Sequence, residues 1–502
     1  MASDARHIVV LGIDGLRPDL VTEGTMPHLA ALASDGTWNR RHTTVFPSET
    51  RGALTALATG ATAQVNGIAG NQFYIRGTSP DQVFTETTHD WWAADERLAG
   101  NLVKAPSISE VLHQAGRPFA VVTSSGPGAL PALNWKGQQR GQTGFNVRHP
   151  QIGYPHSFAA RAHRSLKIPA GGISADGPMT AFRVFEREVW PYDKPAATIL
   201  WCTEVDSVSH LHGLQSSQLR ENMQACDDVI GELRAWRDAQ PERDSITLFI
   251  VSDHGHVTIG GTVNVADALC QAGFKAAASF NDHATQVLVR PGRAVGLWLK
   301  HDDPVLLRDI RDFMMEQVWF GGAFSPASEP GSISGAVDGS LALELLGAGG
   351  ERAPGLFVHL GKTLADDQTD QAGHVDSVFY DPGDNDLRIG GGTHGGLHRG
   401  EFTAVLAGYG AGLAQGRVSD APSSITDIAP TILSLLGIDA PKTMTGRVLG
   451  GDAPESEELA YAEILSAGAH KTTFLTGIKR QGHFHVSEGG IQKGQPTEGL
   501  AP

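Results

Sequence analysis

Cysteine is scarce in this chain, with three residues among 502. Cys202, Cys226 and Cys270 are far apart and form no CxxC pair, so neither a disulfide framework nor a thiolate metal site is expected. Basic residues are outnumbered, with 39 lysines and arginines against 55 aspartates and glutamates and a formal net charge of −16. This balance argues against binding to a nucleic-acid polymer or an anionic membrane. It does not exclude anionic substrates, because bound metal ions reverse the local field.

Long apolar segments are absent as well. No window approaches 18 consecutive apolar residues, so we expect no membrane-spanning helix. The first residues, MASDARHIVVLGIDG, lack the apolar stretch of a secretory signal and contain a run of strand length. A cytoplasmic location is the resulting expectation, and homo-oligomerisation is left open.

Short apolar runs, in contrast, recur along the chain and end in polar or glycine-rich turns. They are HIVVLGIDG (7–15), FAVVTSSG (119–126), ATILWCTEVD (197–206), ITLFIVSDHG (246–255) and FTAVLAGYG (402–410). Such runs are typical of strands buried on both faces, and helical patterns such as MPHLAALASDG and ITDIAPTILSLLG lie between them. This alternation predicts an α/β fold with a mostly parallel central sheet flanked by helices.

Composition also suggests the domain organisation. Residues 257–391 are rich in glycine and weak in periodicity, as in GGAFSPASEPGSISGAVDGS, and we interpret them as an inserted cap or lid. Residues 1–256 and 392–451 would then form the catalytic core. Residues 452–502 would form a polar C-terminal extension, with strand candidates in KTTFLTGIKR and GHFHVSE.

Candidate metal ligands gather where the predicted strands end, which is where α/β folds place their chemistry. They occur in GIDG, DSVSH, SDHGH and GGTHGG, and are Asp14, Asp206, His210, Asp253, His254 and His394. Each motif alone is more often a capped turn or a satisfied polar contact, but their joint occurrence at strand ends favours metal binding. Oxygen and nitrogen donors suit Zn²⁺ or Mn²⁺, and two ions ~4 Å apart would clamp both sides of an in-line phosphoryl displacement.

A hydroxyl-rich helix start lies between the first and second of these motifs, in TVFPSETRGALTALATG (44–60). Its hydroxyls either cap the helix or include a nucleophile. A helix N-terminus offers free N–H groups and a positive dipole end to phosphoryl oxygens, which agrees with the second alternative. No motif assigns a role to the adjacent Glu49 and Arg51.

Together these motifs resemble the alkaline phosphatase superfamily, and within it the branch of type I phosphodiesterases/nucleotide pyrophosphatases and phosphonoacetate hydrolases. The resemblance rests on GIDGLRPD, the helix ending in ATG, NGIAGNQFY, APSISEVLHQAGRPFAVVT, EVDSVSH, VSDHGH, GGTHGGL and ITDIAPTILSLLGI. It implies an alkaline phosphatase-like fold for the core, and the cap and tail lie outside it.

The resemblance also implies roles for single residues. In this superfamily the nucleophilic Ser or Thr heads a helix and a Thr-Gly pair begins nine residues later, which points to Thr50 and not to Ser48 or Thr44. One implied metal site consists of Asp206, His210 and His394, and the other of Asp14, Thr50, Asp253 and His254. Asn71 matches an asparagine that donates to a phosphoryl oxygen, with a simple turn residue as the alternative. His256 and His398 match no ligand position and are expected beside the ligands or at the surface.

Two differences between this sequence and the motifs of related enzymes narrow the range of expected activities. Sulfatases need a Cys or Ser at the position of Thr50, so the likeness of FPSETR to their CxPSR signature is superficial. Phosphonoacetate hydrolases carry a lysine pair just after the strand equivalent to FAVVT, where it meets the substrate carboxylate. The present chain reads VTSSGPGAL and has no lysine there, which argues against specificity for phosphonoacetate.

The predicted function is therefore that of a two-metal hydrolase acting on small-molecule phosphoesters. A phosphodiester or nucleotide pyrophosphate bond is the favoured target, cleaved through a phosphoryl-threonine intermediate. The alternatives are a hydrolase of another phosphonate, a phosphomonoesterase, and a non-catalytic metal- or phosphate-binding protein. Two divalent ions are the expected cofactors, zinc before manganese. Trp91 and Trp92 in DWWAADER are interpreted as packing residues rather than as a platform for a substrate ring.

Overall fold

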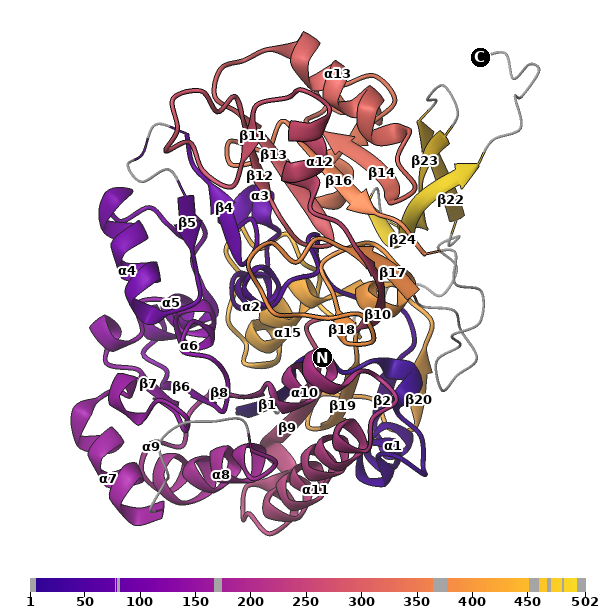
Figure 1. The fold of residues 1–502 in the computed structure, drawn as a ribbon. Helices are drawn as coiled ribbons and strands as arrows, with labels where there is room; N and C mark the ends of the chain where they lie inside the picture. Colours follow the sequence, from indigo (N-terminus) through magenta and orange to yellow (C-terminus); the bar gives the residue numbers. More distant parts are fainter. Residues whose placement is uncertain are drawn as a thin grey trace.

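The computed structural model describes residues 6–76, 78, 82–166, 174–363, 377–450, 460–466, 471–480 and 483–493. Within these ranges the predicted α/β architecture is confirmed, with a large sheet between two layers of helices (Figure 1). No helix in the described ranges is both long and apolar enough to cross a membrane. The predicted C-terminal extension lies partly outside the described residues.

The central sheet has eight strands in the order β20-β2-β19-β9-β1-β8-β6-β7. The five strands from β9 to β7 in this order are parallel, while β19 pairs antiparallel with β9. All five apolar runs of the sequence form strands of this sheet. The strands are β1 (His7–Ile13), β2 (Thr37–Asn39), β6 (Phe119–Thr123), β7 (Thr143–Asn146), β8 (Ala197–Cys202), β9 (Ile246–Val251), β19 (Leu406–Gly410) and β20 (Arg417–Ser419).

Both faces of the sheet are buried, which explains why its strands are apolar at successive positions. Along β1, Ile8 and Val10 belong to one core cluster, whereas Val9 and Leu11 belong to the other. The first cluster includes residues of α2 (Thr50–Thr59), α5 (Ile108–Gln114), α6 (Ala129–Leu133) and α15 (Ile428–Leu435). The second includes residues of α1 (Pro27–Asp35), α7 (His156–Leu166), α8 (Gly177–Val184) and α11 (Ser217–Asp238).

A close approach between β1 and β8 helps to position Asp14, the first of the candidate metal ligands. A Cβ atom on Gly12 would lie 2.0 Å from the ring of Trp201, so only glycine leaves room for this indole. Trp201 in turn donates from Nε1 to Asp14 Oδ2 at 3.3 Å. The glycine of the first strand therefore helps to fix the first acidic side chain beyond it.

Residues of the predicted insertion form a second sheet, of order β11-β12-β13-β16-β14-β15, near the top of Figure 1. Its strands are β11 (Ala276–Ala277), β12 (Val287–Arg290), β13 (Ala294–Leu299), β14 (Phe320–Ser325), β15 (Leu341–Ala342) and β16 (Leu356–Leu360). The helices α12 (Val265–Gln271) and α13 (Pro304–Met315) contact it. The domain boundaries themselves stay a prediction.

Further strands join the two ends of the insertion and form the tail. The strand β10 (Val257–Thr262) pairs with β17 (Ser377–Tyr380) and with β18 (Gly392–Thr393). The predicted tail strands are present as β23 (Lys471–Arg480) and β24 (His483–Lys493), which form a sheet with β22 (Ala460–Ser466). This sheet contacts the insertion, where the Ala323 N–H donates to Thr473 Oγ1 at 3.1 Å.

Candidate active site

The structure brings together all six predicted metal ligands at the carboxyl edge of the central sheet. Four of them follow the adjacent strands β1, β8 and β9, and His210 lies one helical turn beyond Asp206 on α10 (Glu204–His212). The i, i+4 spacing places these two side chains on one face of the helix. His394 follows β18 and reaches the same place from far along the chain.

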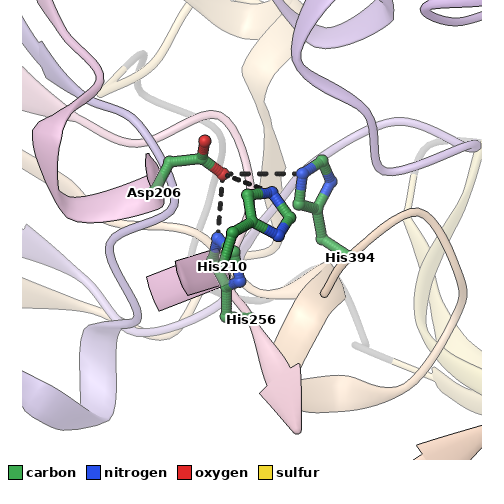
Figure 2. Close-up of side chains that lie close together, drawn as sticks. All are labelled: Asp206, His210, His256 and His394. Carbon is green, nitrogen blue, oxygen red and sulfur yellow. Dashed lines mark hydrogen bonds and ion pairs between the residues drawn. The ribbon is translucent and has the colours of Figure 1, made fainter. Parts of the chain in front are cut away.

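One group of ligands surrounds a single carboxylate oxygen. Asp206 Oδ1 lies 3.3 Å from His210 Nε2 and 3.5 Å from His394 Nε2 (Figure 2). The other ring nitrogen of each histidine contacts a backbone carbonyl at 2.7 Å, that of Gly392 for His210 and that of Ser48 for His394. Since a carbonyl only accepts, Nδ1 of each histidine carries a proton, which leaves Nε2 as the nitrogen that a metal ion would bind.

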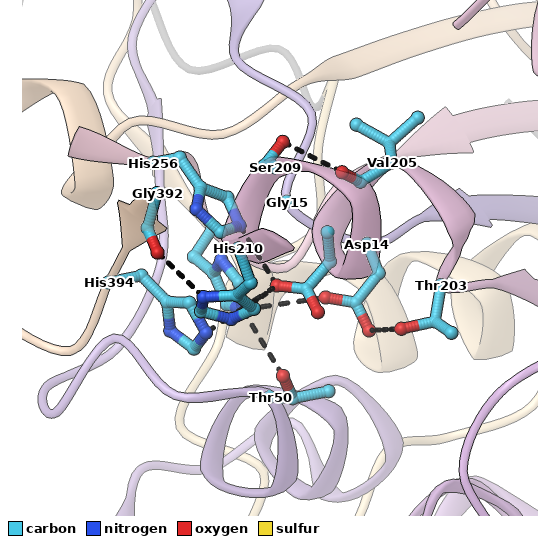
Figure 3. A network of polar contacts seen from close by, with 12 residues as sticks. Asp14, Gly15, Thr50, Thr203, Val205, Ser209, His210, His256, Gly392 and His394 are labelled. Atoms are coloured by element: carbon cyan, nitrogen blue, oxygen red, sulfur yellow. Dashed lines mark hydrogen bonds and ion pairs between the residues drawn. The ribbon is translucent and has the colours of Figure 1, made fainter. Parts of the chain in front are cut away.

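A second group surrounds His254 Nε2. This nitrogen lies 3.2 Å from Thr50 Oγ1, 3.3 Å from Asp253 Oδ2 and 3.5 Å from Asp14 Oδ1. Figure 3 shows Thr50 at the start of its helix, projecting toward the histidines and Asp14. His254 Nδ1 contacts the carbonyl of Gly255 at 3.0 Å, so Nε2 is again the nitrogen that a metal ion would bind.

In their hydrogen bonds with the described residues, Asp14 and Asp253 each use only one of their two oxygens. Asp14 Oδ2 accepts from Thr203 Oγ1 as well as from Trp201, and Asp253 Oδ1 accepts from the N–H groups of Gly15 and His254. Asp14 Oδ1 and Asp253 Oδ2 are buried and have no hydrogen-bond partner among the described residues. A buried carboxylate oxygen without a partner is costly, and a cation would satisfy both. The donor set therefore fits a divalent metal ion.

The electrostatics of the carboxylates agree with this fit. Burial and the charge of Asp206 raise the pKa of Asp14, and burial together with Asp14 and Asp206 raises the pKa of Asp253. Burial alone would also raise the pKa of Asp206, but His210 and His256 hold it well below the usual value. Burial and the charge of His254 lower the pKa of His394, which favours its neutral, ligating form. The centre thus holds more negative charge than its side chains neutralise.

The contacts at the start of α2 show in part whether the hydroxyls there cap the helix or are left for another role. The helix α2 begins at Thr50 with Glu49 as its N-cap residue, and the Glu49 side chain makes no capping hydrogen bond. Ser48 Oγ instead donates to the carbonyl of Gly396 and accepts from the N–H of Gly395, both at 2.9 Å. The capping interpretation of Ser48 and Thr50 is therefore wrong.

Asn71 is held against this helix start. Its Oδ1 accepts from the N–H of Arg51 at 2.9 Å, and its own N–H donates to Glu49 Oε2 at 2.7 Å. Glu49 forms a buried ion pair with Arg290 on β12. Among the described residues Asn71 Nδ2 has no hydrogen-bond partner, so this amide remains able to donate to a ligand.

His256 is a site residue that the sequence motifs did not assign. Its side chain is fully buried, and its Nε2 lies 2.9 Å from Asp206 Oδ1 (Figure 2). Burial lowers the pKa of His256 to about 4, so the neutral ring donates this hydrogen bond. A Cβ on Gly15 or Gly392 would lie 2.8 Å from the ring. The sequence signal was the i, i+2 spacing to His254, which in an extended segment places both side chains on the same side.

The remaining candidates, His398, Trp91 and Trp92, make contacts that support the fold. His398 is the N-cap residue of α14 (Arg399–Phe402), where Nδ1 accepts from the N–H of Gly400 at 3.1 Å. Trp91 is fully buried, and Trp92 stacks on Trp135 with ring centroids 5.0 Å apart. The packing interpretation of both tryptophans is confirmed.

Comparisons with known proteins agree with this arrangement. The family described as type I phosphodiesterase / nucleotide pyrophosphatase matches residues 8–315. A relative from Schizosaccharomyces pombe, an uncharacterised pyrophosphatase/phosphodiesterase, is 22% identical over 253 residues, which are 49% of this chain and 44% of that protein. The match thus spans less than half of the relative's length.

Two solved structures share the fold. Phosphonoacetate hydrolase from Sinorhizobium meliloti 1021, solved with phosphonoformate, has a TM-score of 0.61 at 18% identity and covers 86% of this chain and 95% of its own. Murine ectonucleotide pyrophosphatase / phosphodiesterase 5 has a TM-score of 0.58 at 14% identity and covers 86% and 96%. At these identities the likeness concerns the fold alone.

Proposed function

Because the chain belongs to the type I phosphodiesterase / nucleotide pyrophosphatase family, within the alkaline phosphatase superfamily, we propose that it is a metal-dependent hydrolase of small-molecule phosphoesters. The favoured target is a phosphodiester or a nucleotide-type pyrophosphate bond. The observation that carries this proposal is the pair of unpartnered oxygens on Asp14 and Asp253 beside the Thr50 hydroxyl.

Two sets of side chains would hold two divalent ions, zinc before manganese. The first set is Asp206, His210 and His394, and the second is Asp14, Thr50, Asp253 and His254. Bound there, the ions supply Lewis acidity toward the phosphoryl oxygens and lower the pKa of the attacking hydroxyl. The 3.2 Å contact of Thr50 Oγ1 with His254 Nε2 supports this hydroxyl as the one that a bound ion would activate.

The chain's own residues then account for the substitution at phosphorus. Thr50 Oγ1 attacks the phosphorus atom, the bond to the departing oxygen breaks, and a phosphoryl-threonine forms. Water hydrolyses this ester and restores the Thr50 hydroxyl. Asn71 Nδ2 and the N–H of Thr50 at the start of α2 donate to the equatorial oxygens, whose charge grows in the transition state, while the N–H of Arg51 holds Asn71 Oδ1.

The predicted insertion contributes to the surroundings of this chemistry. Residues 257–391 place Arg290 against Glu49, the residue before Thr50. We include the predicted division into core, insertion and extension in the proposal, with substrate choice set by the insertion and by the segment from Gln72 to Val103.

The test combines metal analysis with a substrate panel. The purified protein should contain about two equivalents of zinc or a similar metal, and chelation should abolish turnover that added metal restores. Matched para-nitrophenyl diester, monoester and phosphonate substrates, together with a nucleotide, should show the highest kcat/KM for diesters. Full turnover by a thoroughly demetallated sample would refute the proposal, and a clear monoester preference would move the protein to the phosphatases.

A further inference from the structure

Arg51, the residue after Thr50, carries a partly buried guanidinium that has no ion-pair partner among the described residues. The buried Arg352 donates to backbone carbonyls, whereas four other arginines with little exposure are matched with a carboxylate. These pairs are Arg17 with Asp19, Arg148 with Glu204, Arg290 with Glu49 and Arg293 with Glu401. Arg51 is only partly buried, and its terminal nitrogens are not among the buried unpartnered atoms of the described residues. An unpaired guanidinium that stays accessible beside a reaction centre suits an anion that arrives from outside.

The structure holds this guanidinium by one of its nitrogens only. Arg51 Nε donates to the carbonyl of Thr85 at 3.2 Å, and the two terminal nitrogens donate to no described residue. Gly126 and Gly128 lie against the group, since a Cβ atom there would be 3.2 Å from Nη2 and 2.9 Å from Nε. The segment after β6 therefore leaves the terminal nitrogens uncovered by side chains at these two positions.

The position of Arg51 relative to the metal ligands decides what it can recognise. Asp14, Asp206, Asp253 and Glu86 attract the guanidinium, yet none of them lies within ion-pair distance of it. The group lies near the segment of Asn71, because Thr85, whose carbonyl it contacts, donates to the Asn71 carbonyl. Two divalent ions would neutralise the three aspartates and leave the charge of Arg51 available to the substrate, with Glu86 as the acidic neighbour outside the proposed ligand set.

We propose that Arg51 binds a second anionic group of the substrate, a carboxylate or phosphate on a substituent of the phosphorus that Thr50 attacks. The two terminal nitrogens form the fork that binds such oxygens in a bidentate manner. The proposal rests on the proposed function for the identity of the reacting group. It narrows the substrate to phosphoesters with an acidic substituent and makes Arg51 a specificity-determining residue.

The turnover experiment uses two para-nitrophenyl phosphodiesters that differ only in the charge of the second alcohol, glycolic acid against glycolamide. The wild-type protein should prefer the acid by about 10- to 100-fold in kcat/KM, the range expected for hydrogen bonds between charged groups. Arg51→Gln should bring the acid-to-amide ratio close to one, and Arg51→Lys should retain part of it. Arg76→Gln removes an exposed arginine paired with Asp302 and is the matched control, which should keep the wild-type ratio.

A binding experiment separates this proposal from the hydrolase proposal. Phosphonopropionate and phosphonopropionamide are titrated calorimetrically into the metal-loaded wild-type and Arg51→Gln proteins. Tighter binding of the acid that disappears in Arg51→Gln supports the second-anion site even if neither diester is turned over, a result that would refute only the hydrolase. Equal binding of acid and amide by the wild-type protein, or an acid preference that persists in Arg51→Gln, overturns the role of Arg51.

Discussion

Thr50 and Ser48 are two residues apart, but their hydroxyls have different partners. The Thr50 hydroxyl contacts His254 Nε2, which lies near the unpartnered oxygens of Asp14 and Asp253, whereas the Ser48 hydroxyl is hydrogen-bonded to the loop after His394. A covalent nucleophile is required for the reaction path itself. A buried hydroxyl in two backbone hydrogen bonds contributes to stability instead.

This difference predicts opposite signatures for two alanine variants. Thr50→Ala should lower kcat by orders of magnitude with little change in melting temperature, because its hydroxyl caps no helix. Thr50→Ser should retain measurable activity. Ser48→Ala should stay largely active. It should lose about 1–3 kcal/mol of unfolding free energy, because the two hydrogen bonds of the Ser48 hydroxyl are removed. Normal turnover by Thr50→Ala together with a dead Ser48→Ala would identify Ser48 as the nucleophile.

His256 has a role that only its contact with Asp206 reveals. Its neutral ring donates to Asp206 Oδ1, the oxygen that also faces His210 and His394. Losing such an orienting partner typically weakens metal affinity 10- to 100-fold. His256→Ala should therefore raise the metal dissociation constant by about this factor in a competition with a chelator. His42→Ala, which removes another buried histidine hydrogen-bonded to Ser423, is the control and should bind metal like the wild type.

At the scale of strands and helices, the order of the core could be predicted from the sequence because local signals were strong. Strands buried on both faces are apolar throughout, so β1, β6, β8, β9 and β19 were recognisable as continuous runs. The ligand motifs followed because each lies directly behind such a strand or, for His394, before the last one.

What the sequence could not show depends on contacts between distant elements. The choice of Ser48 as the carbonyl partner of His394, the burial of His256 between two glycines and the ion pair of Glu49 with Arg290 all join segments far apart in the chain. No local pattern encodes these contacts. These contacts also orient the candidate metal ligands. The candidate ligands could therefore be predicted from the sequence, but the residues that hold them in place could not.

The approach of β1 to β8 supports a prediction at this scale. Gly12→Ala would place a methyl group 2.0 Å from the Trp201 ring, so the indole must move and its hydrogen bond to Asp14 is lost. Overpacking of this kind costs about 1–3 kcal/mol. We expect a lower melting temperature together with weaker metal binding. Gly24→Ala, which meets only Thr22 Oγ1 at 3.8 Å, should change neither property, and a Gly12→Ala protein with wild-type metal affinity would disprove the coupling.

At the scale of the whole molecule, buried arginines join the predicted insertion to the predicted core. Arg290 pairs with Glu49 and Arg293 with Glu401, while Arg352 donates to backbone carbonyls that include those of Gly67 and Leu102. Breaking one buried pair leaves a charge uncompensated and costs about 3–5 kcal/mol. The second sheet is therefore held firmly beside the helix start that carries Thr50.

Metal removal should be visible in the stability of the whole protein. Ions that bind only the folded chain add about 2.7 kcal/mol when their concentration is 100 times the dissociation constant. Chelation should therefore lower the melting temperature, and added zinc should restore it. In His394→Ala, which lacks one ligand, the shift on chelation should be smaller. Identical melting curves with and without metal would count against a centre built from these side chains.

The hydrogen bond from His394 to the Ser48 carbonyl spans 346 positions of the chain, and it has a consequence for biosynthesis. During translation the nucleophile helix and the strands of Asp14, Asp206 and Asp253 emerge from the ribosome well before His394 does. These acidic strand ends therefore lack the imidazole of His394 until the segment that carries it has been synthesised. If the proposed metal centre forms, its loading would therefore be a late event in the synthesis of the polypeptide. A product terminated before residue 394 would contain most of the proposed ligands and still lack a complete centre.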